Sequence, residues 1–345
     1  MRKLIDKLAE NHSLTRGEYL EIIKNATADD VTYLAELALA EKEKHYGTEV
    51  FIRGLIEISN ICKNDCYYCG IRASNKNCDR YRLCENEILE CCDAGYELGF
   101  RTFVMQGGED GFFTDEVLCS IISKIKAAHP DCAVTLSLGE RSMESYQKLR
   151  ASGADRYLLR HETATKEHYE KLHPATLSFE RRMECLENLR SCGYQVGCGF
   201  MVGSPYQTLE MLADELVFIE RFKPDMCGIG PFIPHKDTPF NNYTAGSADL
   251  TCMLLSMIRL IHPTVLLPAT TALGTIKDDG RERGILSGAN VVMPNLSPMS
   301  VRKKYMLYDN KLSSGAESAE ELDKLKQKLA AIGCTVGASR GDVKK

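Results

Sequence analysis

The sequence predicts an α/β protein built on a (β/α)8 TIM barrel, with helices before the first strand and a helical extension after the last. The first observation is alternation, because short β-rich apolar runs recur along the chain with helical stretches between them. The second is number, since eight such runs within about 250 residues are typical of a barrel. The third is position: polar or glycine-rich residues follow nearly every run. An open, doubly wound sheet is the competing prediction.

Each predicted strand is a short apolar run bounded by turn-forming or polar residues. In chain order the strands span residues 50–59, 102–106, 133–137, 156–160, 195–202, 226–230, 265–269 and 290–293. Between them, residues 208–221 give a clear helical pattern, because apolar side chains recur there on one face. Thr114 and Ser178 each precede acidic residues and a helical stretch, so we expect both to begin helices.

The chain divides into three predicted regions. Residues 1–48 form N-terminal helices, residues 49–300 form the barrel, and residues 301–345 form a C-terminal extension packed on it. Within the extension, residues 319–331 have the clearest helical spacing. No repeat of fixed period and no low-complexity linker interrupts this order.

The composition is that of an ordinary globular protein, with 44% hydrophobic and 26% charged residues among 345. The net charge of −5 gives no reason to expect a nucleic-acid partner or an anionic membrane. No signal-peptide core and no apolar run of about 18–20 residues is present, so we expect a cytoplasmic protein with no membrane partner. Fifteen cysteines suit a reducing, anaerobic cytosol, and most of them read as small buried apolar side chains.

Barrels carry their active sites where the strands end, at the carboxyl edge. The residues at that edge in this sequence are mostly polar, charged or glycine. They occupy positions 59–60, 106–110, 137–140, 160–163, 203–205, 231–235, 270–271 and 294–295. Eight such edges in register predict a ring-shaped site.

Directly after the first predicted strand, three cysteines follow a CxxxCxxC spacing: Cys62, Cys66 and Cys69. Chance would give roughly 0.03 such matches along the chain. Three thiolates from one loop can converge on a soft metal centre. Two alternatives stay open here, a zinc site closed by Cys78 and a redox pair of Cys66 with Cys69.

A cluster with three protein ligands leaves one iron open, and an open metal position lets a cofactor bind the metal directly. Iron–sulfur chemistry together with S-adenosylmethionine (SAM) generates organic radicals. Tyr68, just before the last cysteine, would then lie over the adenine of that cofactor. Packing within the loop is the plainer interpretation of Tyr68.

The CxxxCxYC loop resembles that of the radical SAM superfamily. Further motifs resemble the HydE family of FeFe-hydrogenase maturases over residues 1 to about 310. These motifs are DRYLLRHET at 155–163, GIGPFIPH at 228–235, PATT at 268–271 and VMPN at 292–295. The resemblance implies one 4Fe-4S cluster on Cys62, Cys66 and Cys69, whose open iron binds SAM and whose electron releases a 5′-deoxyadenosyl radical.

The resemblance also assigns residues that hold SAM. They are Tyr68, Gln106, Gly107, Gly108, Thr135, Ser137, Glu162 and Arg182. Glycine lets the backbone come close to the cofactor, although a plain turn is the alternative for that motif. Glu162 can accept from hydroxyl or amino groups, and Arg182 can pair with a carboxylate. The resemblance favours Arg182 over the adjacent Arg181.

Other positions match those that line a positively charged cavity in the HydE family. They are Arg53, Arg156, Arg160, Thr270, Thr271, Met226, Met293, Tyr305 and Tyr308. Arginines within barrel strands are costly unless they pair with anions, and salt bridges to Asp155 or Glu57 are the alternative for any one of them. The two methionines could equally be core fillers.

The implied substrate is a cysteine-bound Fe(CO)2(CN) precursor supplied by HydG, in assembly of the H-cluster. The implied partners are the HydF scaffold and a reductant protein such as ferredoxin or flavodoxin. Many HydE proteins carry a second cluster on three cysteines after the segment that holds Tyr305 and Tyr308. Residues 311–320 contain no cysteine and Cys334 stands alone, so we expect no second cluster.

Three alternatives remain at this point. A methylornithine synthase, which rearranges lysine, should pair the amino groups of its substrate with carboxylates, whereas the predicted cavity is rich in arginine. A biotin synthase needs ligands for a sulfur-donating second cluster, and the sequence offers none that is obvious. A non-catalytic iron–sulfur scaffold would keep the three cysteines but would have no need of Glu162 and Arg182.

Overall fold

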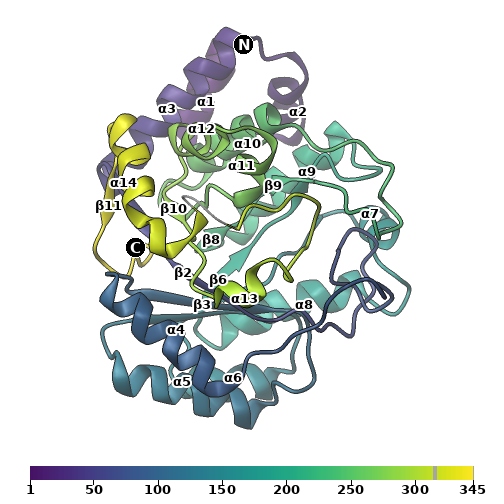
Figure 1. The fold of residues 1–345 in the computed structure, drawn as a ribbon. Coiled ribbons are helices and arrows are strands. Elements are labelled where there is room, and N and C mark those ends of the chain that lie inside the picture. The colour runs from purple at the N-terminus through teal and green to yellow at the C-terminus, as the bar shows by residue number, and fades with distance from the viewer. Residues whose placement is uncertain (314–316, 345) are drawn as a thin grey trace.

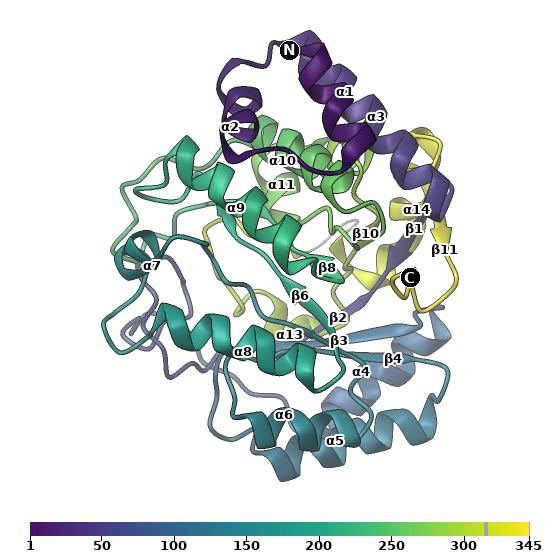
Figure 2. The same ribbon diagram turned by 180° about the vertical axis from the view of Figure 1, so that it is seen from behind.

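Parallel strands form the centre of the protein and helices cover their outer side (Figures 1 and 2). The computed structural model describes residues 1–313 and 317–344. Its strands are β1 (Glu49–Ile52), β2 (Gly54–Ser59), β3 (Thr102–Gly107), β4 (Ala133–Ser137), β5 (Arg156–Leu158), β6 (Gln195–Cys198), β7 (Met201–Val202), β8 (Met226–Cys227), β9 (Gly230–Pro231), β10 (Val291–Val292) and β11 (Thr335–Gly337).

The helices alternate with these strands and flank them at both ends of the chain. They are α1 (Arg2–Asn11), α2 (Arg16–Asn25), α3 (Ala28–Tyr46), α4 (Glu85–Glu97), α5 (Asp115–Ala128), α6 (Met143–Ala151), α7 (Lys166–Leu172), α8 (Phe179–Ser191), α9 (Leu209–Phe222), α10 (Ala248–Ile261), α11 (Thr271–Ile276), α12 (Gly280–Leu286), α13 (Met299–Arg302) and α14 (Leu322–Ala331), with the 3-10 helix η2 (Ala319–Glu321) before the last. Every helix in the described part of the chain is too short or too polar to cross a bilayer.

The strands follow one another around a ring. Six of them form a parallel sheet in the order β2-β3-β4-β5-β6-β8. Single parallel bridges from Met226 to Leu266 and from Pro268 to Val291 continue this order from β8 to β10, which pairs with β1. The N–H of Leu55 in β2 donates to the carbonyl of Pro294 at 2.9 Å, beyond the end of β10. The predicted α/β class and barrel-type architecture are therefore confirmed.

Several predicted strands are shorter in the structure than in the prediction. The segment 50–59 divides into β1 and β2 at Arg53, and the segment 195–202 divides into β6 and β7. Gly199, between the latter two, has a φ of +154°, and a Cβ there would collide with the carbonyl of Gly228. The segment 265–269 is reduced to single bridges, since Pro268 has no N–H to donate.

Local capping explains where two helices begin. The Thr114 hydroxyl accepts from the N–H of Val117 at 3.4 Å, and the Ser178 hydroxyl accepts from the N–H of Arg181 at 3.2 Å. Such side chains satisfy N–H groups that lack a partner within the helix. Both predicted helix starts are confirmed.

The two ends of the chain pack on the barrel. Helices α1 and α3 contact α10, and α2 contacts α9 (Figure 1). At the other end, β11 pairs in parallel with β1, so the last described residues lie against the first strand (Figure 2). The predicted helix at 319–331 is present as η2 and α14, whereas β11 is an addition to the prediction.

Candidate functional site

A cavity of about 340 Å³ lies at the carboxyl ends of the ring of strands. Its lining includes the three cysteines and many of the residues that the sequence singles out. The predicted residues that line it are Cys62, Cys66, Tyr68, Cys69, Gln106, Gly107, Gly108, Ser137, Arg160, Glu162, Arg182, Thr270, Thr271, Met293, Tyr305 and Tyr308. The strand ends therefore meet at one site, as a barrel requires.

Polar side chains fix the loop that carries the cysteines. Asp65, between the first two, accepts a paired interaction from Arg72, with a Nε–Oδ1 distance of 2.7 Å. The Arg72 guanidinium is the largest cause that holds the pKa of the Asp65 carboxyl well below its usual value. Arg80 donates to the carbonyls of Ile71 and Arg72 from the far end of the loop. A loop without regular secondary structure is thus held by charge-assisted hydrogen bonds.

The first cysteine lies against the glycine-rich turn after β3. The Cys62 Sγ accepts from the N–H groups of Asn64 at 3.4 Å and Glu109 at 3.3 Å. A Cβ on Gly108 would collide with the carbonyl of Ile61 and would lie 2.7 Å from the Cβ of Cys62. Only glycine lets this turn approach the cysteine so closely. N–H groups aimed at a sulfur also suit a thiolate that binds iron.

The three thiols lie in a protein environment with little solvent. Burial raises the pKa of Cys62, raises that of Cys66 to about 12, and raises that of Cys69 further. Such thiols become thiolates only when a positive centre compensates their charge, as an iron cluster does. Within residues 1–313 and 317–344, no three His, Cys, Asp or Glu side chains surround a point that would hold a single ion. Cys78, the fourth zinc ligand considered above, accepts from Asn60 at 3.5 Å instead.

Glu162 enters the cavity from a strained turn after β5. Its φ is +66°, a conformation that costs a non-glycine residue free energy and that concentrates at functional sites. Its Oε2 lies 3.2 Å from the Arg160 Nη2, an ion pair without hydrogen-bond alignment. Among the described residues, Glu162 Oε2 and Thr270 Oγ1 are buried without a hydrogen-bond partner. Two unsatisfied oxygens at one cavity suit a ligand that donates to them.

Arg182, and not its neighbour Arg181, reaches the cavity from α8. Its Nε donates to Glu140 at 2.6 Å, and its Nη1 donates to the carbonyl of Arg160 at 2.6 Å. The nearby Tyr169 and Glu140 outweigh the effect of burial and raise the pKa of Arg182. Arg181 pairs with Glu184 at the surface. A permanently charged guanidinium therefore lies beside the cysteine loop.

Tyr68 is held by a histidine behind it. The His173 Nδ1 lies 2.9 Å from the carbonyl of Tyr169, which can only accept, so this nitrogen carries the proton. Burial, and next the charge of Arg182, lower the pKa of His173 to about 3, so the ring is neutral. The Tyr68 hydroxyl therefore donates to the His173 Nε2 at 3.2 Å. This hydrogen bond fixes the side chain in the wall of the cavity.

A buried ion pair that the sequence did not predict, between Lys311 and Glu57, lies in the same wall. The Lys311 Nζ lies 2.6 Å from Glu57 Oε1, and the amide of Asn295 donates to Glu57 Oε2 at 2.9 Å. Lys311 also lies over the ring of Tyr305, whose hydroxyl accepts from Gln106 at 3.4 Å. A charge within the apolar run 50–59 was a signal for Glu57, whereas Lys311 carries no sequence signal.

Four predicted residues lie outside the cavity lining. Arg156 is the first residue of β5 and Arg160 follows its end, so the two arginines lie at opposite ends of one strand. The Arg156 Nη2 pairs with Asp342 at 2.6 Å. The Arg53 Nη1 lies 2.9 Å from the sulfur of Met226. The structure therefore does not bring the three predicted arginines together.

The fourth of these residues is Thr135, in the middle of β4. Its side chain is buried, and its hydroxyl lacks a hydrogen-bond partner in the part of the chain that the structure describes. Ser137, two residues further along the same strand, does line the cavity. The pair lies on one face of β4, because side chains of a strand alternate.

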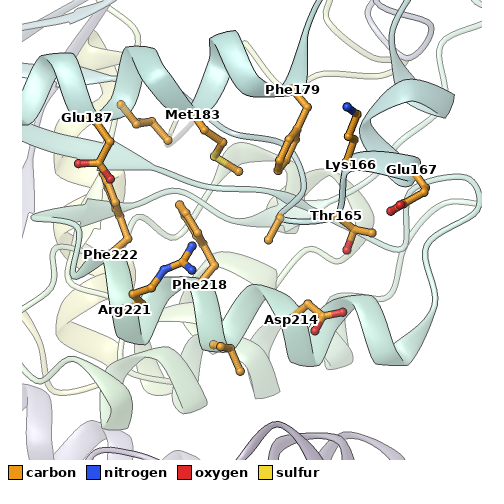
Figure 3. Close-up of a pocket in the computed structure, with 13 residues that line it drawn as sticks. Thr165, Lys166, Glu167, Phe179, Met183, Glu187, Asp214, Phe218, Arg221 and Phe222 are labelled. Carbon is orange, nitrogen blue, oxygen red and sulfur yellow. The ribbon is translucent and has the colours of Figure 1, made fainter.

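A second cavity, of about 510 Å³, lies among α7, α8 and α9. Figure 3 shows Phe179 and Met183 from α8 opposite Phe218 from α9, with Arg221 and Asp214 at the same helix. Its lining combines apolar rings with surface charges and contains no cysteine. The candidate active site is therefore the first cavity, which joins the cysteines to Glu162 and Arg182.

The residues of this cavity fit a three-ligand cluster with a polar organic cofactor. The close approach at Gly108, the unsatisfied Glu162 Oε2 and the Arg182 guanidinium supply a tight turn, an acceptor and a carboxylate partner. Comparison with known proteins agrees. The family model described as the Radical SAM superfamily matches residues 56–219.

Individual relatives show which family within this superfamily the chain belongs to. The chain is 44% identical over 315 residues to the [FeFe] hydrogenase maturase subunit HydE of Thermotoga maritima, which covers 90% of this chain and 88% of that protein. It is 27% identical over 309 residues to the 3-methylornithine synthase of Methanosarcina acetivorans, with 89% and 87% covered. The crystal structure of a methylornithine synthase superposes with a TM-score of 0.86 at 25% identity over 97% of both chains. The chain belongs to the HydE family of the radical SAM superfamily, and it is a radical SAM enzyme.

Proposed function

We propose that the protein matures FeFe hydrogenase by radical chemistry on a cysteine-bound Fe(CO)2(CN) precursor during assembly of the H-cluster. The 44% identity to a HydE subunit over 90% of the chain carries this proposal. The cavity supports it, because the cysteine loop, Glu162 and Arg182 line one cavity at the ends of the strands.

Cys62, Cys66 and Cys69 would hold one 4Fe-4S cluster, and the chain would carry no second one. When bound, the cluster supplies the electron that cleaves SAM to a 5′-deoxyadenosyl radical. Arg182 would pair with the cofactor's carboxylate, and Glu162 would accept from its hydroxyl or amino groups. The turn at 106–108, Tyr68 and Ser137 would complete the cofactor's site, and Thr135 would act from behind Ser137 on the same face of β4.

The substrate would occupy the rest of the cavity. Arg160, Thr270, Thr271, Met293, Tyr305 and Tyr308 line the cavity and would contact the substrate. Arg160 supplies a positive charge for an anionic iron complex or for the carboxylate of its cysteine. Arg53, Arg156 and Met226 would act from the amino end of the barrel, by supporting the strands that carry these residues.

Three protein partners follow from this role. HydG would supply the precursor, HydF would receive the product as the assembly scaffold, and a ferredoxin or flavodoxin would deliver electrons to the cluster.

A methylornithine synthase is the second candidate. The crystal structure of such an enzyme superposes with a TM-score of 0.86, and the cavity wall contains a carboxylate, Glu57, of the kind that could bind an amino group of lysine. That carboxylate is already paired with Lys311, which leaves it less able to bind an amino group of lysine. The pairing favours the maturase.

Substrate choice tests the proposal. The protein is reconstituted anaerobically, reduced, and given SAM with either the synthetic cysteine-bound iron precursor or lysine. We expect 5′-deoxyadenosine formation to rise about tenfold or more with the iron precursor and to stay at its basal rate with lysine. Stimulation by lysine with formation of methylornithine would reverse the choice. Cluster loading without any 5′-deoxyadenosine would indicate a scaffold instead of an enzyme.

A further inference from the structure

A histidine and a glutamate, both fully buried (0% exposed), lie behind the turn that carries Glu162. The His161 Nε2, in the turn after β5, is 2.7 Å from the Glu215 Oε2 on α9. The other oxygen, Glu215 Oε1, accepts from the N–H of Ala164 at 2.7 Å. A buried carboxylate is costly unless hydrogen bonds satisfy it, and here each oxygen has a donor.

The hydrogen bonds fix which ring nitrogen of His161 carries the proton. The N–H of Gly199 points at the His161 Nδ1 at 3.2 Å, and a backbone N–H can only donate. Nδ1 is therefore the acceptor and Nε2 carries the proton that Glu215 accepts. Only this tautomer of His161 satisfies both contacts, so the hydrogen bonds run in one direction, from Gly199 to His161 and from His161 to Glu215.

The same contacts enclose the strained residue. The N–H of Glu162 donates to the carbonyl of Gly199 at 3.0 Å, while the N–H of Gly199 bonds the adjacent His161. Two residues after Glu162, Ala164 is tied to Glu215. The φ of +66° at Glu162 is thus held from both sides, which such a conformation requires in order to persist.

We propose that the His161–Glu215 pair is a positioning device that holds Glu162 in its left-handed conformation and so presents its carboxylate to the cofactor. This inference rests on the proposed role of Glu162 in binding SAM. Neither His161 nor Glu215 belongs to the cavity lining, so both act through the turn. The Phe218 ring, 4.5 Å from that of His161, closes the other side of the pair. Phe218 also lines the second cavity (Figure 3), so this one ring contacts both the pair and that cavity.

Glu215→Gln tests this device with a minimal change of shape. A glutamine offers one acceptor where two N–H donors, from His161 and Ala164, need one each. Moving the histidine proton to Nδ1 does not help, because it would then face the N–H of Gly199. The turn must lose at least one buried hydrogen bond in the variant. Glu210→Gln is the matched control, since Glu210 lies on the same helix and its side chain pairs with Lys24 at the surface.

The first readout needs no cofactor. Amide hydrogen exchange of a peptide covering residues 161–165 should become about tenfold faster or more in Glu215→Gln and stay unchanged in Glu210→Gln. The second readout is equilibrium binding of SAM to the reconstituted protein, followed by the change in the cluster's spectrum. We expect the dissociation constant to rise about tenfold, with the iron content unchanged.

A double variant provides the rescue. In Glu215→Gln with His161→Glu, the new carboxylate can accept from Gly199 and from the glutamine amide, whose oxygen accepts from Ala164. The exchange rate of residues 161–165 and the dissociation constant for SAM should then return towards the wild-type values. In Glu215→Asp the side chain keeps its charge but is too short to reach both donors. This variant replaces Glu215→Gln in the experiment if Glu215→Gln does not fold.

If the amides of residues 161–165 exchange as slowly in Glu215→Gln or Glu215→Asp as in the wild-type protein, the inference is overturned. Faster exchange that leaves the SAM affinity unchanged would also overturn it. If the loaded wild-type protein itself binds no SAM, the proposed function fails instead, and the exchange result still shows whether the pair holds the turn.

Discussion

Gly108 is the residue where the turn after β3 comes closest to the cysteine loop. In Gly108→Ala the added Cβ would meet the carbonyl of Ile61 and the Cβ of Cys62, so the loop or the turn must move. We expect a loss of about 1–3 kcal/mol in the free energy of unfolding, typical of overpacking, and less iron bound after reconstitution. Thermal unfolding and an iron assay measure the two effects.

Gly111→Ala is the control for this substitution. Gly111 lies three residues further on, and a Cβ there would meet no atom within 4 Å. It should therefore keep both stability and iron content. Equal behaviour of the two alanine variants would show that the close approach at Gly108 has no part in holding Cys62.

The cysteine loop is the element whose geometry depends most on polar contacts. In Asp65→Asn the paired interaction with Arg72 loses its charge, and one N–H of the guanidinium loses its acceptor. We expect a loss of about 1–2 kcal/mol in stability and faster loss of iron to a chelator. Asp79→Asn changes a carboxylate that pairs with Lys304 at the exposed side of the loop, and it should leave the rate of iron loss unchanged. Equal rates in the two variants would contradict the role given to Asp65.

At the scale of elements, sequence periodicity predicted most strands and the helix starts, because both depend on local patterns of burial and capping. It failed where pairing with a distant part of the chain decides whether a strand forms. Residues 265–269 form only single bridges, and β11 exists because it pairs with β1 across the whole length of the chain. Arg156 and Arg160 were both predicted to line the cavity, whereas they lie at opposite ends of β5 and only Arg160 lines it. Lys311 reaches Glu57 from 254 positions away, which no local pattern reveals.

At the scale of the whole molecule, the C-terminal residues 340–342 contact the barrel at the amino ends of its strands. Asp342 compensates the charge of Arg156, which is fully buried. In Asp342→Asn this guanidinium would keep a hydrogen-bond partner but lose its counter-charge, so we expect a loss of about 1–3 kcal/mol in the free energy of unfolding. Asp323→Asn, at an exposed pair with Lys326, should change stability by less than about 0.5 kcal/mol. Urea unfolding compares them, and equal midpoints would contradict the role of Asp342.

Three histidines, the buried His168 and His173 and the partly buried His262, should make the stability of the molecule depend on pH, because loss of solvent around each ring lowers its pKa. Burial, followed by a nearby arginine, lowers the pKa of His173 to about 3 and that of His262 to about 4, from 6.5. Above about pH 7.5 all three rings are neutral in both the folded and the unfolded chain. Below it the unfolded chain binds protons that the folded chain does not, so the free energy of unfolding falls as the pH falls. Between pH 6.5 and 5.0 this loss amounts to about 2 kcal/mol each for His173 and His262, at about 1.4 kcal/mol per pKa unit.

Carboxylates with lowered pKa values, such as Asp342 and Glu320 at about 2, add to this loss mainly below about pH 5. Urea midpoints at pH 7.5 and 5.0 therefore isolate the histidines. His262→Gln should make the difference in the free energy of unfolding between the two pH values smaller by about 2 kcal/mol. A wild-type midpoint that does not change between them would show that these rings can be protonated in the folded protein.

The assignment of the cluster to Cys62, Cys66 and Cys69 is tested most directly by replacing the middle ligand. Wild-type protein and Cys66→Ala are reconstituted anaerobically with iron and sulfide, reduced, and incubated with SAM, and 5′-deoxyadenosine is measured. Cys78→Ala, outside the cavity, is the matched control. We expect wild-type protein and Cys78→Ala to form 5′-deoxyadenosine and Cys66→Ala to form none. Cleavage by Cys66→Ala, or no cleavage by fully loaded wild-type protein, would contradict the assignment.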